Sequence, residues 1–527
     1  MFSFLRKTPT KSPSEEPVRK EPVIDATALG GNTNARDAKR HKAYAQQRFA
    51  AASSPRIKSN GFFSAGLSVD ETLRRDLMRL KAASRAAGED VGYMKRYFSM
   101  VQTHVIGDKG PRLHAEVRDK RGELDKIANQ SIEKGFMQWA KLGVCEISGR
   151  MDLVAAAQLI AKTVCQDGDI IIRHIDGAPN KFGYAFQLLE ADLLDVTLNK
   201  DLGNGNRIKM GVEIDKWGRH TAYHLLTNHP GEFTWSSNGK RYMRLTADEV
   251  TLPFPMFRPG QTRGVPWAHA SLLDFHDIGG YRESSLVASR IAASNMVMYE
   301  RDPEQEAPED EEEGDFIFEL DPGGAAITPE GYRAKETNFQ HHGDSVADFQ
   351  KAGLKGAFAG VDVNYSTGGN DYEGVSWSSL RQAVLEDREH WKRHQGWFIS
   401  QVMSVIYKRW LKNALLHGGI ENLMPFDLER SVEAFSFKGR RWQWVDPLKD
   451  EQAIGAAMEN FTCNPMDILN EKGVDIDAMA EGWGTYLSAL GPVMEIASKL
   501  GIGKAAKLAV ATAKAAPSEK GDDDETE

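Results

Sequence analysis

A helical pattern opens the first part of the chain that has clear periodicity. From Ser68 to Val105, apolar residues recur every three or four positions, which places them on the faces of helices. Ser68 and Asp70 suit the start of such a helix, because their side chains accept hydrogen bonds from backbone N–H groups. The glycine in the segment 86–88 disfavours a helix and predicts a break. We therefore expect two consecutive helices over residues 70–105.

Alternating patterns typical of strands follow, together with two more helical stretches at residues 122–141 and 151–166. The turn Asp-Lys-Trp-Gly at 215–218 lies between two of the strand-like runs and predicts an antiparallel hairpin. Residues 62–255 are thus predicted to form an α+β unit with a mainly antiparallel sheet. Its strand-like segments are 169–175, 182–189, 207–215, 221–226 and 242–252.

Long helices dominate the second half of the sequence. Residues 272–298 have the pattern of one helix, although Gly279 and Gly280 weaken its first part. Residues 344–358 predict a shorter helix, and residues 376–415 give the strongest helical pattern of the chain. At 1.5 Å per residue this last helix would be about 60 Å long. It would therefore extend beyond one small domain.

Shorter segments complete the second half. Residues 300–340 contain two strand-like runs, at 316–320 and 327–334, around a Pro-Gly-Gly turn, which predicts a small β-rich insertion between helices. After Pro447 the pattern becomes helical again, at about 449–458 and 476–490.

Composition places the chain among folded proteins with more than one core. Its 527 residues exceed what a single hydrophobic core supports. The 41% hydrophobic and 27% charged residues are typical of folded chains. No apolar run approaches the roughly 18 residues that a membrane span needs, and the N-terminus lacks the apolar core of a signal peptide. Three scattered cysteines predict neither a disulfide framework nor a zinc site, and they fit a reducing cytoplasm.

Charge is distributed unevenly along the chain. Residues 1–60 hold 12 Lys or Arg against 5 Asp or Glu, which is typical of a mobile basic arm; it is either a solvated tail or an arm that binds DNA or a scaffold. In contrast, seven of the ten residues at 304–313 are acidic and predict an exposed loop. The net charge of −9 argues against a protein that coats DNA through a basic face, but not against one past which DNA slides.

Candidate motifs for catalysis are incomplete. The segment 501–504, Gly-Ile-Gly-Lys, resembles a phosphate loop, but Ala505 replaces the residue that would hold magnesium. The segment 203–205, Gly-Asn-Gly, lacks the third glycine of a dinucleotide site, which favours a turn. His341 and His342 are adjacent, and adjacent side chains do not normally converge on one metal ion. We therefore expect no catalytic residue, cofactor or metal.

Two short sequence motifs resemble those of a known family. Residues 260–264 read Gly-Gln-Thr-Arg-Gly, just ahead of the first long helix. Residues 375–381 read Val-Ser-Trp-Ser-Ser-Leu-Arg and open the longest helix, with Arg381 in the family's place and Trp377 as a departure from its commonest form. In this order the two motifs resemble those of portal proteins of lambda-like tailed phages. The resemblance covers about residues 62–490.

The resemblance implies a ring-forming structural protein and not an enzyme. Members of the family usually assemble about twelve subunits around a DNA channel. The implied α+β portal fold has an α/β wing, a helical stem, a small β-rich clip, a long tunnel-side helix and a helical crown. The expected divisions are a basic disordered arm (1–61), wing (62–255), first stem helix (256–298), clip (299–343), second stem helix (344–358), tunnel loop (359–376), long helix with return to the wing (377–447), crown (448–515) and acidic tail (516–527).

The same likeness implies partners and a location. The partners are further copies of the chain, double-stranded DNA that passes non-specifically, the terminase large subunit, head–tail connector and completion proteins, and the major capsid protein and scaffold; a membrane is not among them. The protein would lie at the portal vertex of the capsid in the virion, after assembly in the cytoplasm of the bacterial host.

Three groups of residues are candidate sites under this interpretation. A polar tunnel loop would repel the phosphates of passing DNA and so would not retard it, although an ordinary exposed connection has the same composition. Trp377 and Arg381 are candidates for the helix start and for assembly. The tryptophans of the long helix, Trp377, Trp391, Trp397 and Trp410, are candidates for core or interface anchors. The tunnel-loop candidates are Asp362, Asn364, Asn370, Asp371 and Glu373, and the clip docking candidates are Glu309, Asp310, Glu311, Glu312 and Glu313.

Two other classes of function stay open. A magnesium-dependent DNA-processing enzyme would need a compact group of carboxylates beside Lys or His, and the sequence gives no such group. Another structural protein of the phage head and tail, such as an adaptor, would usually be much shorter than this chain.

Overall fold

The computed structural model describes residues 67–203, 205–232, 241–293, 297–301, 332–336, 343–442, 447–460, 462, 479–480, 482–488 and 490–491. By compactness the chain divides into two units, residues 1–68 and residues 69–527. All of the helices and strands named below belong to the second unit.

Two consecutive helices open this unit, α4 (Val69–Asp90) and α5 (Gly92–Val101). The break expected at 86–88 is wrong, because the helix continues through Gly88 and is interrupted only at Val91, which is extended with φ −103° and ψ 109°. Gly88 is needed for packing instead. A Cβ atom at this position would lie 2.7 Å from Cε2 of Phe98, so a larger residue would hold the two helices apart.

Two antiparallel sheets and two helices form the α+β part. In every strand pair of these sheets the strands run antiparallel, which confirms the predicted sheet type. The segment 242–252, expected as one strand, supplies one strand to each sheet. The helices are α6 (Lys126–Trp139) and α7 (Leu153–Asp167). The smaller sheet has the spatial order β3 (Tyr184–Leu189), β2 (Ile171–Asp176), β9 (Val250–Thr251). The larger sheet has the order β4 (Lys200–Asp201), β5 (Arg207–Lys209), β6 (Val212–Ile214), β7 (His220–Leu226), β8 (Tyr242–Thr246).

Tight turns set the register of the larger sheet. The segment 207–215, expected as one strand, is a hairpin of β5 and β6, because Met210 (φ 48°) and Gly211 (φ 81°) form a two-residue turn between them. Positive φ at both central residues is the geometry that matches the twist of paired strands. The hairpin predicted between β6 and β7 is confirmed, and the Asp215 carboxylate fixes its turn by accepting the backbone N–H of Trp217 at 2.8 Å.

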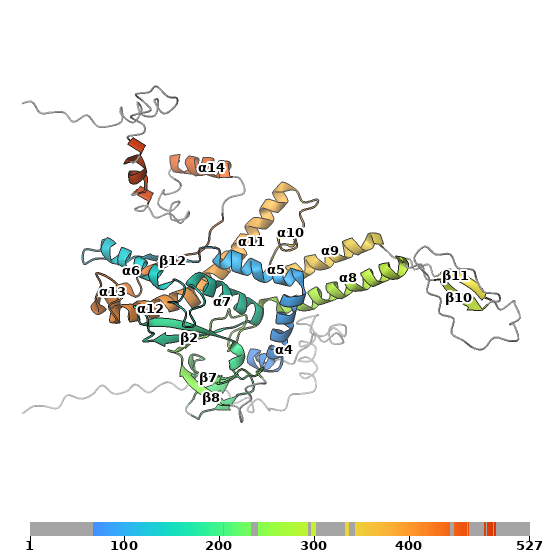
Figure 1. The fold of residues 1–527 in the computed structure, drawn as a ribbon, viewed down its shortest axis with the longest axis horizontal. Helices are drawn as coiled ribbons and strands as arrows, with labels where there is room; N and C mark the ends of the chain where they lie inside the picture. The colour runs from blue at the N-terminus through green and yellow to red at the C-terminus, as the bar shows by residue number, and fades with distance from the viewer. Residues whose placement is uncertain are drawn as a thin grey trace, which may run out of the picture. The chain divides into compact units, whose positions relative to one another are not determined.

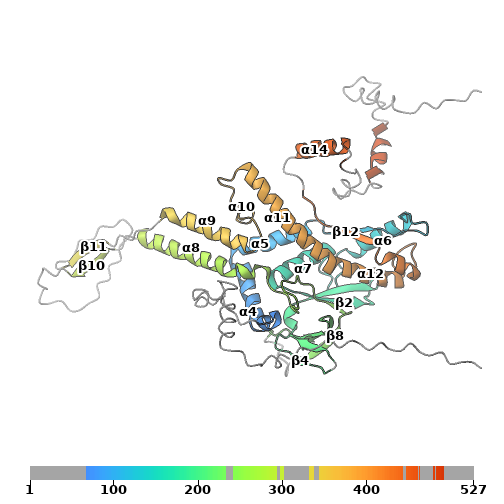
Figure 2. The ribbon, with the colours of Figure 1, turned by 180° about the vertical axis from the view of Figure 1, so that it is seen from behind.

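A helical hairpin leads away from the sheets. Helices α8 (Leu272–Ala293) and α9 (Gly343–Ala359) lie side by side in both views (Figures 1 and 2). The rings of Tyr281 and Phe349 pack between them with centroids 4.5 Å apart. Helix α8 ends before the expected residue 298, because β10 (Val297–Arg301) is a strand that pairs antiparallel with β11 (Tyr332–Glu336).

The longest predicted helix is confirmed. It consists of α11 (Trp377–Phe398), the π-helical segment η5 (Ile399–Met403) and α12 (Ser404–Leu416), with helical φ and ψ at both junctions. Trp391 and Trp410 are buried to 1% exposure or less, as core residues. Trp397 is partly buried and packs against the same core.

The main core is built from segments far apart in the sequence. Side chains of α5, α6, α7, β2 and β3 pack with those of the long helix, so that Phe136 meets Trp410 edge to face at 5.1 Å. Strand β1 (Arg112–Ala115) pairs antiparallel with β12 (Phe435–Lys438), a strand that the sequence pattern did not indicate. The long helix therefore completes the core of the expected wing.

Short elements and one further helix account for the rest of the described chain. Helix α14 confirms the helical pattern after Pro447, and the expected helix at 476–490 is helical at its described residues. Among the described residues, no helix combines the length and apolar character that crossing a bilayer requires. The short elements are η2 (Gln102–Ile106), η3 (Ala191–Leu193), η4 (Trp267–Ala270), α10 (Tyr365–Gly368), η6 (Pro425–Asp427) and α13 (Leu428–Ser431), and α14 spans Pro447–Glu459.

Candidate functional site

The loop that follows α9 is folded onto its neighbours rather than extended into solvent. Val361 and Val363 point into the core, each 4% exposed, on either side of Asp362, whose φ is 56°. Asn364 then caps α10, because its side-chain oxygen accepts the backbone N–H of Ser366 at 2.9 Å. Apolar anchors and a local cap therefore fix the first half of the loop 359–376.

Two side chains from other helices hold this loop from outside. Arg96 on α5 donates to the carbonyl oxygens of Thr367 and Gly368, both at 2.8 Å. Asp387 on α11, which is 7% exposed, accepts the backbone N–H of Asn364 at 2.9 Å and the hydroxyl of Thr367. Burial raises the pKa of Asp387. The sequence pattern gave no sign of either contact, because Arg96 lies on a helix far from the loop in the sequence and Asp387 lies inside the helix that follows it.

The second half of the loop is fixed by a partly buried ion pair. The Asp371 carboxylate accepts hydrogen bonds from Lys351 Nζ at 2.9 Å and from the Tyr365 hydroxyl at 2.8 Å. The Lys351 ammonium, followed by the Tyr365 hydroxyl, lowers the pKa of Asp371 to about 2. A second, exposed pair joins Asp362 to Arg393 at 3.3 Å.

The five predicted loop residues thus have different roles in the structure. Asp362, Asn364 and Asp371 support the fold of the loop itself, whereas Asn370 and Glu373 are exposed. Asn370 has a φ of 55°, a left-handed conformation that Asn tolerates well. The carboxylate of Glu373 makes no hydrogen bond with any of the described residues. A role of these side chains toward DNA stays a prediction.

The start of α11 is capped by a residue that we did not single out. The Ser376 hydroxyl accepts the backbone N–H of Ser379 at 3.2 Å, and a Ser followed three residues later by a polar residue is a cap signal that the sequence already contained. Trp377 is 62% exposed, so the core interpretation of this side chain is wrong, and its interface role stays a prediction. Arg381 is exposed one turn further along.

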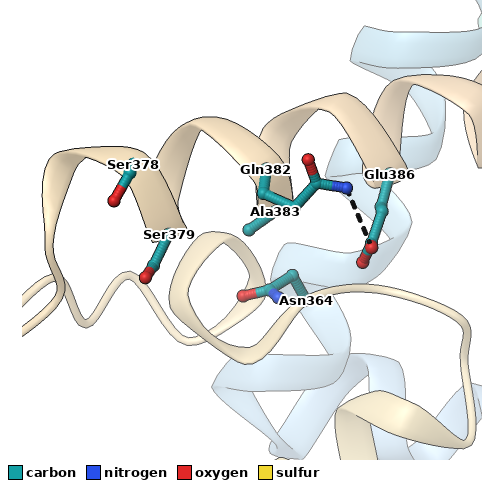
Figure 3. Close-up of a pocket in the computed structure, with 6 residues that line it drawn as sticks. All are labelled: Asn364, Ser378, Ser379, Gln382, Ala383 and Glu386. Carbon is teal, nitrogen blue, oxygen red and sulfur yellow. Dashed lines mark hydrogen bonds between the residues drawn. The ribbon is translucent and has the colours of Figure 1, made fainter.

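A shallow polar recess of about 410 Å³ lies beside this helix start (Figure 3). The Gln382 side chain donates to Glu386 at 3.3 Å across it, and the close-up places Asn364 below the helix. Among the residues that line it, no nucleophile is hydrogen-bonded to a base. Its lining is Asn364, Ser378, Ser379, Gln382, Ala383 and Glu386.

The Gly-Gln-Thr-Arg-Gly segment forms a buried ionic cluster. Arg263 is 1% exposed and donates to the Asp169 carboxylate at 2.6 Å, while Lys81 Nζ reaches the same carboxylate at 2.8 Å. Burial by itself would raise the pKa of Asp169, but the Arg263 guanidinium and the Lys81 ammonium outweigh it and lower that pKa to about 2. Asp192 and Arg85 extend the cluster through a contact of 2.7 Å.

The remaining residues of the segment attach it to α4 and to α7. The Asp70 carboxylate accepts the backbone N–H and the hydroxyl of Thr262, both at 2.8 Å, so this residue anchors the segment to the start of α4. Gly264 approaches the end of α7 so closely that a Cβ atom on it would lie 2.0 Å from the carbonyl oxygen of Gly168. The motif therefore connects the beginning of α8 to the α+β core.

Several expected sites lie outside the described residues: the acidic clip candidates Glu309–Glu313, the pair His341 and His342, and the segment 501–504. The glycines at 203 and 205 lie between the paired strands β4 and β5 with φ of 76° and 88°, which confirms the turn.

One group of potential metal ligands was not foreseen: Glu190, Asp192 and His229. Asp192 already accepts hydrogen bonds from Lys81 at 3.3 Å and from Arg85 at 2.7 Å, so its charge is compensated. The group has the composition that the DNA-processing alternative requires, but with Asp192 bound to two cations it does not by itself favour that alternative.

Sequence comparisons give a consistent result. The family described as "Phage portal protein, lambda family" matches residues 57–395. A curated "Probable portal protein" of Halomonas phage phiHAP-1 is 32% identical over 474 residues, which cover 88% of this chain and 87% of the relative.

Solved structures are similar over long stretches at low identity. The neck of an empty gene transfer agent particle matches with 12% identity over 80% of this chain and 98% of that chain, at a TM-score of 0.41. An HK97 family phage portal protein from Corynebacterium diphtheriae matches with 10% identity over 71% and 97%, at a TM-score of 0.32. Because these TM-scores are low, the assignment depends on the sequence comparisons. On that basis the chain belongs to the lambda family of phage portal proteins, a family of structural proteins of the virion.

Proposed function

We propose that copies of this chain close into a ring of about twelve at a capsid vertex, and that double-stranded DNA passes through the ring during packaging and ejection. The proposal follows from membership in the portal family. The observation on this chain that carries it is the hairpin of α8 and α9. Its two helices contact each other, yet Leu273, Leu286 and Phe349 remain 69%, 52% and 56% exposed. Apolar side chains so placed fit contacts with further copies.

In this proposal the parts of the chain have separate roles. Residues 62–255, completed by the long helix, form the wing. The hairpin of α8 and α9 forms the stem around the channel, residues 299–343 form the clip, and residues 448–515 form the crown. The loop 359–376 faces the DNA. The ion pairs of Asp371 and Asp362 with Lys351 and Arg393 support its shape and compensate these charges. Glu373 stays exposed and the loop itself contains no Lys or Arg, so it binds phosphates weakly.

The partners follow from the same assignment. The terminase large subunit and, after packaging, the connector and completion proteins would dock at the clip, where the acidic residues 309–313 suit basic surfaces. The major capsid protein and scaffold would surround the wing, and assembly would take place in the bacterial cytoplasm.

Electron microscopy of the purified full-length chain tests the proposal. We expect rings on the order of a hundred ångströms or more wide with a central hole, as some dozen 58.5 kDa subunits require. Monomers at every concentration would overturn it. Trp377→Ala and Arg381→Ala should lower ring yield, and Ser400→Ala on an exposed turn of the same long helix serves as the matched control.

A further inference from the structure

Two histidines lie on one face of α11. His390 and His394 are four residues apart, and side chains at this spacing are neighbours on a helix. Their ring centroids are 4.6 Å apart, and the ring planes are inclined by 64°. In His-Glu-x-x-His motifs, two histidines at the same helical spacing both bind one zinc ion. The helix therefore presents two imidazoles close together.

The distance between the rings suits a shared metal ion. A zinc–nitrogen bond is about 2.0–2.1 Å long, and the centre of an imidazole lies roughly 1.2 Å beyond its nitrogen, so two rings bound at about 90° to 110° have centres roughly 4.5–5.2 Å apart. The observed 4.6 Å lies within this range. The rings are not parallel, so the arrangement allows one nitrogen atom of each to reach the same ion.

The buried Nε2 atom of His390 also indicates a ligand. The side chain is 9% exposed, and Nε2 makes no hydrogen bond within the part of the chain that the structure describes. A buried polar atom without a partner is unfavourable, and an ion bound to it would remove this cost. Burial also lowers the pKa of both histidines, so both rings are neutral at pH 7, as ligands must be.

The other nitrogen of His390 faces a carboxylate. Asp362 Oδ2 lies 4.0 Å from Nδ1, and carboxylates commonly accept the N–H of a metal-bound histidine. Arg393 Nη2 donates to Nδ1 at 3.4 Å and pairs with Asp362 at 3.3 Å. Its guanidinium opposes a cation, but the side chain is 67% exposed and the Asp362 charge compensates it. When Arg393 turns toward solvent, Nδ1 can carry the ring proton and donate it to Asp362, which leaves Nε2 free for the ion.

Two indole rings hold the histidine pair in place. The ring of Trp267 is stacked on that of His394, with centroids 4.1 Å apart, and Trp391 meets His390 edge to face at 4.7 Å. Side chains that are already held lose little freedom when a ligand binds. Trp267 belongs to η4, the turn that leads into α8. His394 is partly exposed, so an ion can enter from solvent.

We propose that His390 Nε2 and a ring nitrogen of His394 bind a divalent first-row transition ion such as Zn²⁺, with water completing its coordination. Imidazole ligands favour this class of ion, whereas Mg²⁺ and Ca²⁺ prefer oxygen ligands. The ion links α11 to Asp362 in the loop 359–376 and fixes His394 against Trp267. This site departs from the expectation of no metal that the sequence motifs gave. Both ligands lie on one helix, so binding does not depend on ring formation.

Zinc titration of the full-length chain by calorimetry at pH 7 tests the site. His390→Phe and His394→Phe each keep an aromatic ring but remove a ligand, and each should weaken zinc binding by roughly tenfold or more. His276→Phe, at a side chain of α8 that is 84% exposed, is the matched control and should bind zinc like the unmodified chain. His229→Phe should also keep the binding, because it alters the separate group of Glu190 and Asp192.

Thermal unfolding shows whether these variants fold and whether zinc stabilises them. Zinc should raise the thermal midpoint of the unmodified chain and of both controls, and raise it less in His390→Phe and His394→Phe, because an ion bound to the folded state stabilises that state. Equal zinc affinity in the unmodified chain and in these two variants would overturn the site. Loss of binding in His229→Phe alone would place the ion at Glu190 and Asp192 instead.

A second measurement needs no variant. Cu²⁺ binds imidazole more tightly than Zn²⁺, and together with ascorbate it oxidises the side chains that bind it. Mass spectrometry of the unmodified chain should therefore find oxidation at His390 and His394, reduced when Zn²⁺ is added in excess. Oxidation confined to other histidines would overturn the site, even if one of the Phe variants fails to fold.

Discussion

Charged residues have different consequences in the buried ionic cluster and in the loop 359–376. In the cluster, Lys81, Asp169 and Arg263 are at most 1% exposed, and each charge is matched by an opposite one. In the loop, Asp371 and Asp362 form their ion pairs in contact with solvent. Removing one partner of a buried ion pair lowers the stability of the protein strongly, whereas exposed ion pairs contribute little to that stability. The cluster therefore links the α+β part to the segment that leads into α8, and the loop can carry negative charge without determining the fold.

Removing the central carboxylate of the cluster should have the largest effect. Asp169→Ala leaves Lys81 and Arg263 buried without their shared partner, and we expect the free energy of unfolding to fall by about 3–5 kcal/mol. Chemical denaturation measures this loss. Glu71→Gln, which removes an exposed partner of Arg74 at 2.6 Å, is the control and should leave the midpoint unchanged. An Asp169 variant as stable as the unmodified chain would contradict the expected difference between buried and exposed ion pairs.

Mild acid should weaken the core before it affects the exposed ion pairs. Burial lowers the pKa of His104 and of His390 to about 4 and that of His394 to about 3, from an ordinary value near 6.5. The unfolded chain binds these protons first, so stability is complete above about pH 6.5 and declines as the pH falls toward 4. We expect the free energy of unfolding to fall in total by on the order of a few kcal/mol. Chemical denaturation at several pH values measures this loss.

His394→Phe provides the control for this prediction. It keeps an aromatic ring against Trp267, whose ring lies 4.1 Å from that of His394, but removes the titrating group. The loss of stability between pH 7 and pH 5 should therefore be smaller in this variant. An unchanged slope would show that His394 does not contribute.

The close approach of Gly264 to α7 should be the next most sensitive feature. A Cβ atom would lie 2.0 Å from a backbone oxygen, so Gly264→Ala must displace the chain and should lower the free energy of unfolding by about 1–3 kcal/mol. Gly279→Ala, on the open side of α8, should instead leave stability unchanged or raise it by up to about 1 kcal/mol. Equal thermal midpoints for the two variants would contradict this interpretation.

The smallest effect is expected in the loop. Asp371→Asn removes the ion pair with Lys351, so amide hydrogen exchange should become faster around 365–373 while the thermal midpoint stays the same. In the unmodified chain the same loosening should appear as the pH falls from about 4 toward 2, because the lowered pKa of Asp371 keeps its charge above that range. Glu373→Gln is the matched control, since that carboxylate makes no hydrogen bond in the described chain.

Sequence patterns predicted the helices better than their boundaries. Periodicity identified the long helix through Trp391 and Trp410, because a buried stripe repeats with the helical period. It misplaced the break at 86–88, because a glycine that permits close packing has the same appearance as one that ends a helix. It also merged β5 and β6, since a two-residue turn barely interrupts an alternating pattern.

The candidate loop was located from the family resemblance and from its polar composition, but the contacts that shape it were not predicted. Asn364 could be suspected as a cap from its type and position. Arg96 and Asp387 could not. Arg96 lies 271 and 272 residues from its acceptors, Asp387 lies 20 and 23 residues from its donors, and neither carries a local signal. The partners of Arg263 were hidden for the same reason.

The sequence by itself determined the helical periodicity, the antiparallel strands, the family and the polar character of the loop, since each of these is encoded in residues close together along the chain. Only the tertiary structure decided that the Gly-Gln-Thr-Arg-Gly segment is part of a buried ionic cluster, that Trp377 is exposed, and that α8 packs against α9. Burial and charge pairing arise from contacts between segments that are far apart in the sequence, so no single stretch of sequence encodes these features.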